Sequence, residues 1–283
     1  TAAVASQPTL RKSDRLLDLS MITLTSTHDR FEQLKSSGLL PSPRGAALAV
    51  VQLTRRDDVT SAQLAQAIMV DPALLARLLK LANSCRSGAS RPVLTIQDAV
   101  KVLGLMAVRG LALGFSLMAD NRSGACKNFD YLQFWSQSLA RAVAMKTLVR
   151  FSRVMQADEA FTLGLLAQIG RLALASVYPD EYARLLQAGV DGRLTEAALL
   201  QAERAAFELD HTEISAELLT DWGLPGGVVE PARFHEQPAQ AQFADGSRAE
   251  RLLWALALAA HIADLCLAKP VQRAAVLAEL PAL

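Results

Sequence analysis

Apolar residues recur at the spacing of an α-helix along almost the whole sequence, and no run alternates apolar and polar residues as a half-buried β-strand does. One set at steps of three and four residues predicts a single face of a long helix: Leu132, Trp135, Leu139 and Val143. A second set predicts another helix: Phe161, Leu165, Ile169 and Leu172. Small residues within it leave room for a neighbouring helix to approach: Gly164, Ala167 and Gly170. This periodicity predicts an all-α fold.

Helix-start signals accompany the periodicity. Thr60 and Gln63 have the spacing of a capping box, in which each side chain bonds the backbone N–H of the other residue. Asp71 precedes Pro72, which places a favourable N-cap residue before a proline at the first helical position. The segment 210–213, Asp-His-Thr-Glu, is an acidic version of the capping box. Each signal predicts where a helix begins.

A polar stretch at 121–128 separates two strongly apolar regions and predicts a boundary within the chain. We expect two packed helical lobes, over residues 28–120 and 129–270. Residues 1–27 are rich in Ser and Thr and weakly patterned, so they are predicted to form a linker or arm. Residues 271–283 form the expected C-terminal tail.

Charge and cysteine content limit the partners and the compartment. The 29 Lys and Arg residues balance 28 Asp and Glu residues, which gives a formal net charge of +1. Such a balance provides no long-range attraction toward nucleic acids or anionic membranes. The three cysteines are widely spaced and form no CxxC pair, as expected of reduced thiols rather than a disulfide framework or a zinc site. We therefore expect a cytoplasmic protein with no nucleic-acid partner.

The apolar segment 252–268 is the best candidate for a membrane span. It contains His261 and Asp264, and an Asp at the centre of a membrane helix costs about 2.5–3.5 kcal/mol. A spanning helix also needs about 20 apolar residues. The segment is therefore predicted to be a buried core helix, with no membrane as partner.

Few residues suggest catalysis. The sequence contains no P-loop, dinucleotide-binding, zinc-protease or nucleophile-elbow motif, and the glycine-rich string 223–227 follows a predicted helix rather than a strand. Taken singly, the histidines favour structural roles: His211 in local capping, and His235 as a cation at a helix end, where the helix dipole favours positive charge.

An ordered series of short motifs resembles the HDOD domain, a bacterial signalling module related to the metal-dependent HD phosphohydrolases. The motifs span roughly residues 28–268: Leu-Leu-Pro-Ser-Pro at 39–43, Asp-Pro at 71–72 with Leu-Ala-Asn-Ser at 81–84, Ile-Gln-Asp-Ala-Val at 96–100, Phe-Trp-Ser-Gln-Ser at 134–138, Gly-Leu-Leu-Ala-Gln-Ile-Gly at 164–170, Glu203 with Asp-His at 210–211, Trp-Gly-Leu-Pro at 222–225, His235, and Ala-Asp at 263–264. Any one of them is weak, whereas the series in order is specific.

The resemblance also shows departures from the catalytic pattern. In catalytic HD relatives, a His in the first long helix, a His-Asp pair and a late Asp bind the metal. Here Gln137 takes the first position and Ala167-Gln168 take the pair, while Asp264 looks like a surviving ligand with His211 and His235 as accessory residues. Ala supplies no donor atom, and Gln cannot offset the charge of a dication. We therefore expect no metal, no other cofactor and no catalytic residue.

The expected fold is an N-terminal HDOD-type bundle packed on a C-terminal degenerate HD-like bundle. The expected function is a non-enzymatic regulatory or scaffolding domain of bacterial signal transduction that acts through protein contacts, as part of a response regulator. The resemblance implies signalling partners from two-component or cyclic-dinucleotide pathways. Two alternatives are a diverged metal-dependent phosphohydrolase that uses His211, His235 and Asp264, and a nucleotide or small-molecule sensor that uses a cavity between the lobes.

The polar residues around one predicted helix have two interpretations. Asp71 is expected to cap its start, and Asn83 to satisfy backbone groups at its end. Alternatively, Asn83 and Ser84 form an exposed partner surface.

Overall fold

Every regular element in the described part of the chain is helical, which confirms the predicted all-α class. The computed structural model describes residues 26–56, 58–84, 92–190, 196–268 and 273. The predicted arm and tail lie outside the described residues except for Ser26, Thr27 and Arg273. Ser26 and Thr27 are no part of a linker, because Ser26 caps a helix that begins at Thr27.

The elements fall into two groups along the chain. The N-terminal helices are α1 (Thr27–Ser36), α2 (Gly45–Leu53), α3 (Ser61–Met69), α4 (Pro72–Ser84), α5 (Ile96–Leu103) and α6 (Leu105–Asp120). The C-terminal elements are α7 (Tyr131–Ser152), α8 (Ala157–Leu166), α9 (Ile169–Val177), α10 (Pro179–Val190), α11 (Glu196–Phe207), α12 (His211–Asp221), α13 (Gly226–Phe234), the 3-10 helix η1 (Pro238–Gln240) and α14 (Arg248–Leu267).

The predicted caps are present where the helices begin. Thr60 and Gln63 form a reciprocal capping box at α3, and Asp210 with Glu213 forms another at α12. At α4, Oδ1 of Asp71 accepts hydrogen bonds from the backbone N–H groups of residues 73 and 74, each at 3.0 Å. The local signals therefore fix these three starts.

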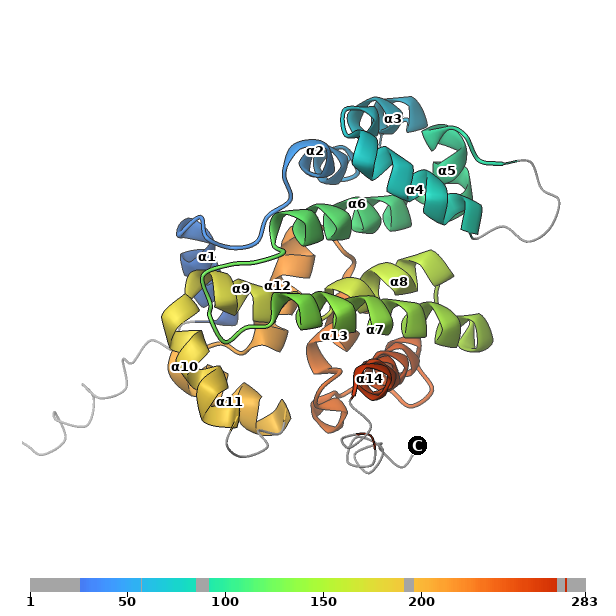
Figure 1. Ribbon diagram of the computed structural model, residues 1–283. Coiled ribbons are helices and arrows are strands. Elements are labelled where there is room, and N and C mark those ends of the chain that lie inside the picture. The colour runs from blue at the N-terminus through green and yellow to red at the C-terminus, as the bar shows by residue number, and fades with distance from the viewer. Residues whose placement is uncertain (1–25, 57, 85–91, 191–195, 269–272, 274–283) are drawn as a thin grey trace, which may run out of the picture.

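The two groups of helices share one hydrophobic core. Helices α2 to α6 gather on one side of the molecule, and α6 packs along α8 (Figure 1). Buried residues of both groups belong to a single cluster, including Leu113 of α6 and Leu165 of α8. Helix α1 falls by sequence within the expected lobe 28–120, but it packs against α12 of the other group. The expected division into two lobes is therefore crossed by α1.

The connection between α6 and α7 is fastened to its surroundings. The side chain of Asn121 donates to the carbonyl of Leu117, and the indole of Trp135 donates to the carbonyl of Asn121, both at 2.8 Å. Further along, Asn128 donates to the carbonyl of Ala183 at 2.8 Å. These bonds tie the predicted loop at 121–128 to α6, α7 and α10.

The structure differs from two helix predictions, one in the direction of a face and one in the number of helices. The stripe on α7 points mostly outward, because Leu132 and Val143 are 78% and 57% exposed while Trp135 is buried. The opposite side of the helix packs against α8 and α14. The second predicted helix is two helices, α8 and α9, separated at Ala167 and Gln168. Periodicity detected the helical conformation but not the direction or the break.

The stretch Ala157–Val177 of α8 and α9 is the one described segment long and apolar enough to cross a membrane by itself. Of its most apolar window, 78% is buried inside the molecule, as in the core helices of proteins without a span. The predicted core helix at 252–268 corresponds to α14, whose buried face includes Leu256 and Ala259.

Candidate functional site

Two side chains of α7 form one wall of a buried polar site. Gln137 and Arg141 are four residues apart and therefore lie on one face of the helix. Nε2 of Gln137 donates to Oδ1 of Asp264 on α14 at 3.1 Å. The buried Arg141 donates from Nη1 to Oε1 of Gln168 at 2.6 Å and from Nε to the carbonyl of Gly164 at 2.8 Å.

The junction between α8 and α9 forms the second wall. Gly164 permits α8 to approach α7, because a Cβ there would lie 2.7 Å from Cα of Ala142. Gly170 permits α9 to approach α12, because a Cβ there would overlap the carbonyl oxygen of His211. The close approach predicted from these small residues is confirmed, and it places the Gln168 side chain between Arg141 and the segment after α13.

His211 lies at the centre of the site. Its Nδ1 is 2.6 Å from Oε2 of Glu203, and its Nε2 is 3.0 Å from both carboxylate oxygens of Glu236. Burial alone would lower the pKa of His211, but the two carboxylates outweigh it and raise the pKa to about 10. The imidazole is thus a buried cation, whereas the sequence predicted a role in local capping, which Asp210 performs.

The two carboxylates are each held from a second direction. The hydroxyl of the buried Tyr182 donates to Oε1 of Glu203 at 3.0 Å. Glu236 accepts from Nε2 of Gln168 and lies 3.6 Å from Nη2 of Arg171. Burial opposes ionisation of Glu236, yet His211 and Arg171 hold its pKa well below the usual range. A continuous chain of polar contacts therefore runs from α10 to α7.

His235 behaves unlike the cation predicted at this helix end. It is buried, and its Nδ1 lies 2.6 Å from the carbonyl of Ala232. Burial lowers the pKa of His235 to about 4, so the ring is neutral near pH 7. The desolvation cost exceeds the favourable effects of the Glu236 carboxylate and the Ala232 carbonyl, which act to raise this pKa. Its Nε2 lies 3.7 Å from Oε1 of Glu236, with no hydrogen-bond partner among the described residues.

Asp264 occupies the far side of the site on α14. Burial raises the pKa of its carboxyl group, and the nearby guanidinium groups of Arg141 and Arg171 act in the opposite direction. The neighbouring His261 also lowers this pKa. Three cationic groups thus face three carboxyl groups in the site: Arg141, Arg171 and His211 against Glu203, Glu236 and Asp264.

Comparison with known proteins identifies the family. The HDOD domain family matches residues 40–238, which is more than half of the chain. This protein belongs to the HDOD family. Helical neighbours include a Shewanella amazonensis SB2B protein provisionally named a phosphohydrolase, with 26% identity, coverage of 90% of this chain and 87% of that one, and a TM-score of 0.64.

Two further relatives differ in how much they share with this HDOD chain. The MmoQ response regulator from Methylococcus capsulatus str. Bath is 42% identical, covers 82% of this chain and 89% of its own, and has a TM-score of 0.49. An uncharacterized protein of Treponema pallidum (strain Nichols) is 27% identical over 205 residues, or 69% of this chain. The chain spans 37% of the length of that curated relative.

The residues at the positions of the HD-type metal ligands, as the family resemblance implies them, do not suit a metal ion in this HDOD domain. The first and third positions carry the neutral amides Gln137 and Gln168, and the second carries the buried Ala167. Arg141 donates to Gln168, so a permanent cation lies beside these positions. Within the described ranges, no group of three or more His, Cys, Asp or Glu side chains could hold a metal ion.

The structure brings together most of the residues that the sequence singled out, and it adds three others. Gln137, Gln168, His211, His235 and Asp264 all belong to the site. Glu203 was part of the motif series but had no predicted role, and Arg141, Arg171 and Glu236 were not singled out. Helical spacing offered a signal for two of them, since Arg141 is one turn after Gln137 and Arg171 one turn after Gln168.

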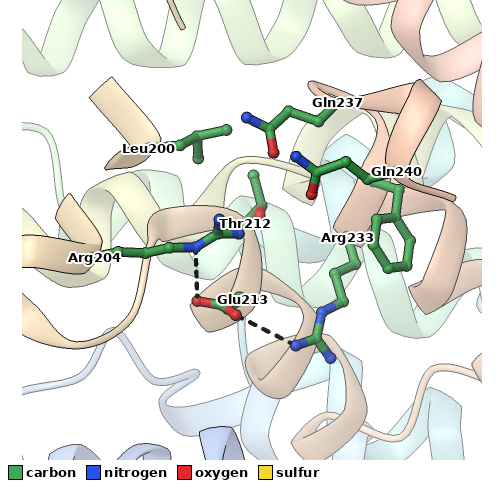
Figure 2. Close-up of a pocket in the computed structure, with 8 residues that line it drawn as sticks. Leu200, Arg204, Thr212, Glu213, Arg233, Gln237 and Gln240 are labelled. Carbon is green, nitrogen blue, oxygen red and sulfur yellow. Dashed lines mark hydrogen bonds and ion pairs between the residues drawn. The ribbon is translucent and has the colours of Figure 1, made fainter. Parts of the chain in front are cut away.

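A small cavity lies next to this site, between α11, α12 and α13 (Figure 2). The side chains of Arg204 and Arg233 both point toward Glu213, at 3.6 and 3.5 Å. The cavity volume is about 20 Å³, enough for about one water molecule. Its charges are compensated and it has room for little more than a water molecule, so we assign no ligand to it.

Asn83 and Ser84 bond to backbone groups near the end of α4. The Asn83 amide donates to the carbonyls of Leu79 and Val93, both at 2.9 Å, and accepts from the N–H of Val93 at 2.8 Å. Ser84 donates to the carbonyl of Leu81 at 2.8 Å. Asn83 therefore connects two chain segments, and its role in a partner surface stays a prediction.

Proposed function

We propose that this HDOD domain is a non-enzymatic regulatory module of bacterial signal transduction that acts through protein–protein contacts. The observation that carries the proposal is the charge balance of the buried site. Its positive charges belong to the side chains of Arg141, Arg171 and His211, which contact Gln168 and Glu236. A metal-dependent hydrolase must instead hold its metal and leave one position open for an activated water.

The arrangement also disfavours acid–base catalysis by the histidines. A catalytic group at neutral pH needs a pKa near the working pH. His211 has its pKa raised to about 10 and that of His235 is lowered to about 4, so neither exchanges protons readily near pH 7. The polar contacts of the site therefore support a structural role.

The exposed stripe on α7 supports a function in protein contact. Leu132, Leu139 and Val143 lie on one face of this helix and are 78%, 37% and 57% exposed. Apolar side chains that lie together at a surface favour association, because burying them against a partner removes them from water. We propose that a signalling protein binds this stripe with an apolar surface of its own.

The partner class and the compartment belong to the same proposal. Partners would be proteins of two-component or cyclic-dinucleotide pathways, in the cytoplasm, with this domain acting within a response regulator. The Methylococcus protein carries the name of a response regulator, and the proposal gives this chain a role of that kind.

The first experiment measures metal content and hydrolysis. The full chain is purified without chelator, analysed for bound transition metals, and assayed against phosphomonoesters and cyclic dinucleotides with added Mn²⁺. We expect less than stoichiometric metal and no turnover above that of a protein-free control. Stoichiometric metal together with activity that Asp264→Ala abolishes would show that the domain is an enzyme.

The second experiment tests the α7 stripe in the native bacterium. Val143→Glu places a charge on the stripe, whereas Gln133→Glu places the same charge at an exposed position on another face of α7. We expect Val143→Glu to abolish both the signalling output and the capture of a specific signalling protein. Gln133→Glu should retain both at the same protein level. Equal output from the two variants would contradict the proposed contact.

A further inference from the structure

Two adjoining cavities form a groove on the molecule, away from the buried polar site. They share Met155, Glu159 and Arg248 as lining residues. One cavity has a volume of about 480 Å³ and the other about 150 Å³, and ligand pockets for small molecules span about 300–1,000 Å³. We call the two cavities together the α8 groove, because residues of α8 line both of them.

The larger cavity is basic. Its lining includes three arginines, Arg150 and Arg153 at the end of α7 and Arg248 at the start of α14, against the single carboxylate of Glu159. Arg248 donates to the carbonyl of Val154 at 2.8 Å, which fixes its position. Across the described part of the chain, no carboxylate pairs with Arg150 or Arg153. The cavity therefore carries positive charge that is not compensated locally.

The smaller cavity is mostly apolar and lies between the two groups of helices. Met106 and Gly110 of α6 face Leu224, Pro225 and Val228 at the start of α13, as the lining residues of this cavity. Such a lining suits a flat aromatic or aliphatic group, which gains by leaving water.

Two helix N-termini add to the positive character of the groove. The N-cap residues of α8 and α13 are Gln156 and Pro225, and neither side chain makes a capping hydrogen bond. Gln156 lines the larger cavity and Pro225 the smaller one. Backbone N–H groups at helix N-termini attract anions, so they reinforce the arginines.

We infer that the α8 groove binds a nucleoside phosphate, with its base in the apolar cavity and its phosphate beside Arg150, Arg153 and Arg248. The arginine forks match phosphate oxygens, and Glu159 at the junction can accept a hydrogen bond from a ribose hydroxyl. The contrast with the cavity in Figure 2 is direct, because the two arginines there share Glu213 and leave space for about one water. This inference is independent of the proposed contact through α7.

Calorimetric titration of the full chain tests both halves of the groove. The probes are AMP, GMP, adenosine and inorganic phosphate. We expect AMP or GMP to bind with a dissociation constant below about 1 mM, and about tenfold or more tighter than adenosine or phosphate alone, because only the nucleotide fills both cavities. The combined variant Arg150→Gln with Arg153→Asn should weaken the nucleotide about tenfold or more. Asn suits position 153, whose φ is 52°.

A matched pair of glycine variants tests the position of the base. Gly227 lines the smaller cavity and Gly226 does not, yet a Cβ at either position meets no atom within 4 Å. Gly227→Leu should therefore abolish nucleotide binding, and Gly226→Leu should preserve it, with both proteins folded. Failure of both nucleotides to bind below about 1 mM, or equal binding by the two glycine variants, would overturn the inference.

Discussion

His211 and His235 both lie close to Glu236, yet their surroundings shift their pKa values in opposite directions. His211 has a second carboxylate, that of Glu203, on its other ring nitrogen. His235 has only a backbone carbonyl there, so burial dominates. One imidazole is therefore a cation that balances two carboxylates, and the other is a neutral packing group.

The neutral state of His235 predicts acid sensitivity. Its folded-state pKa of about 4 lies below the ordinary value of 6.5, so the unfolded chain binds the proton more readily between these values. The free energy of unfolding should therefore decrease as the pH falls from about 6.5 to 4, by about 3 kcal/mol from this group. Urea unfolding at several pH values measures this decrease in the free energy of unfolding. His235→Gln should flatten the profile in this window, and an unchanged slope would contradict the assignment.

The cationic state of His211 predicts an energetic coupling with Glu203. His211→Gln removes the cation that two buried carboxylates share and should lower the free energy of unfolding by about 3–5 kcal/mol. Adding Glu203→Gln should restore part of the loss, because it removes one of the two carboxylates that lose this cation. A double-mutant cycle by urea denaturation measures the coupling, and simple additivity of the two changes would refute it.

At the scale of elements, helix contacts in this protein depend on single glycines. Gly170 at the start of α9 donates its backbone N–H to Oγ of Ser215 at 2.8 Å, and Ser215 donates to the carbonyl of His211 at 2.7 Å. The two helices are thus joined through backbone groups that a side chain at position 170 would separate.

A matched pair of alanine variants tests this contact. A Cβ at Gly170 would overlap the backbone carbonyl of His211, which cannot move without moving α12. Gly170→Ala should therefore destabilise the protein by about 1–3 kcal/mol. Gly226→Ala, where a Cβ meets open space, should leave the stability within about 0.5 kcal/mol. Thermal unfolding of the two variants measures the difference, and equal melting temperatures would show that α9 has room to shift.

Local signals predicted helix starts better than helix faces. The caps at Thr60, Asp71 and Asp210 involve residues three positions apart, so the sequence contains the whole interaction. The direction of a face depends on which other helices arrive. On α7, Leu132 and Val143 fit the helical period, yet α8 and α14 pack on the other side. Periodicity cannot distinguish an apolar stripe in the core from one at the surface.

In the buried site, too, local sequence features could be predicted and contacts that depend on packing could not. That Gln137 and Ala167 stand where HD relatives have metal ligands is visible in the sequence, because a motif position and its residue type can both be seen there. The charged groups around His211 could not be predicted. Glu203 and Glu236 meet at His211 only through the packing of α11, α12 and α13, and a buried carboxylate has no distinct pattern in one sequence.

At the scale of the whole molecule, the single core predicts a single unfolding transition. Phe31 and Leu34 of α1 belong to the same hydrophobic cluster as residues of α12. Fluorescence follows the C-terminal helices, because all three tryptophans lie there, and circular dichroism follows every helix. The unfolding transitions in urea that are measured by fluorescence and by circular dichroism should coincide.

A core variant in α1 extends this test. Phe31 is 1% exposed, and Phe31→Ala should lower the free energy of unfolding by about 3–5 kcal/mol and shift both transitions equally. A shift of one signal without the other would show that the helices do not unfold as one cooperative unit.

The position of α1 also sets an order of events during synthesis. His28 pairs with Glu217 at a separation of 189 residues, and Lys35 with Asp221 at 186. A ribosome that adds about 5–20 residues per second therefore completes the docking surface of α1 roughly 10–40 s after α1 itself emerges. During that interval the apolar side of α1, the first helix in the described residues, lacks the partner helix that buries it. We therefore expect the nascent chain to bind chaperones until α12 has left the exit tunnel.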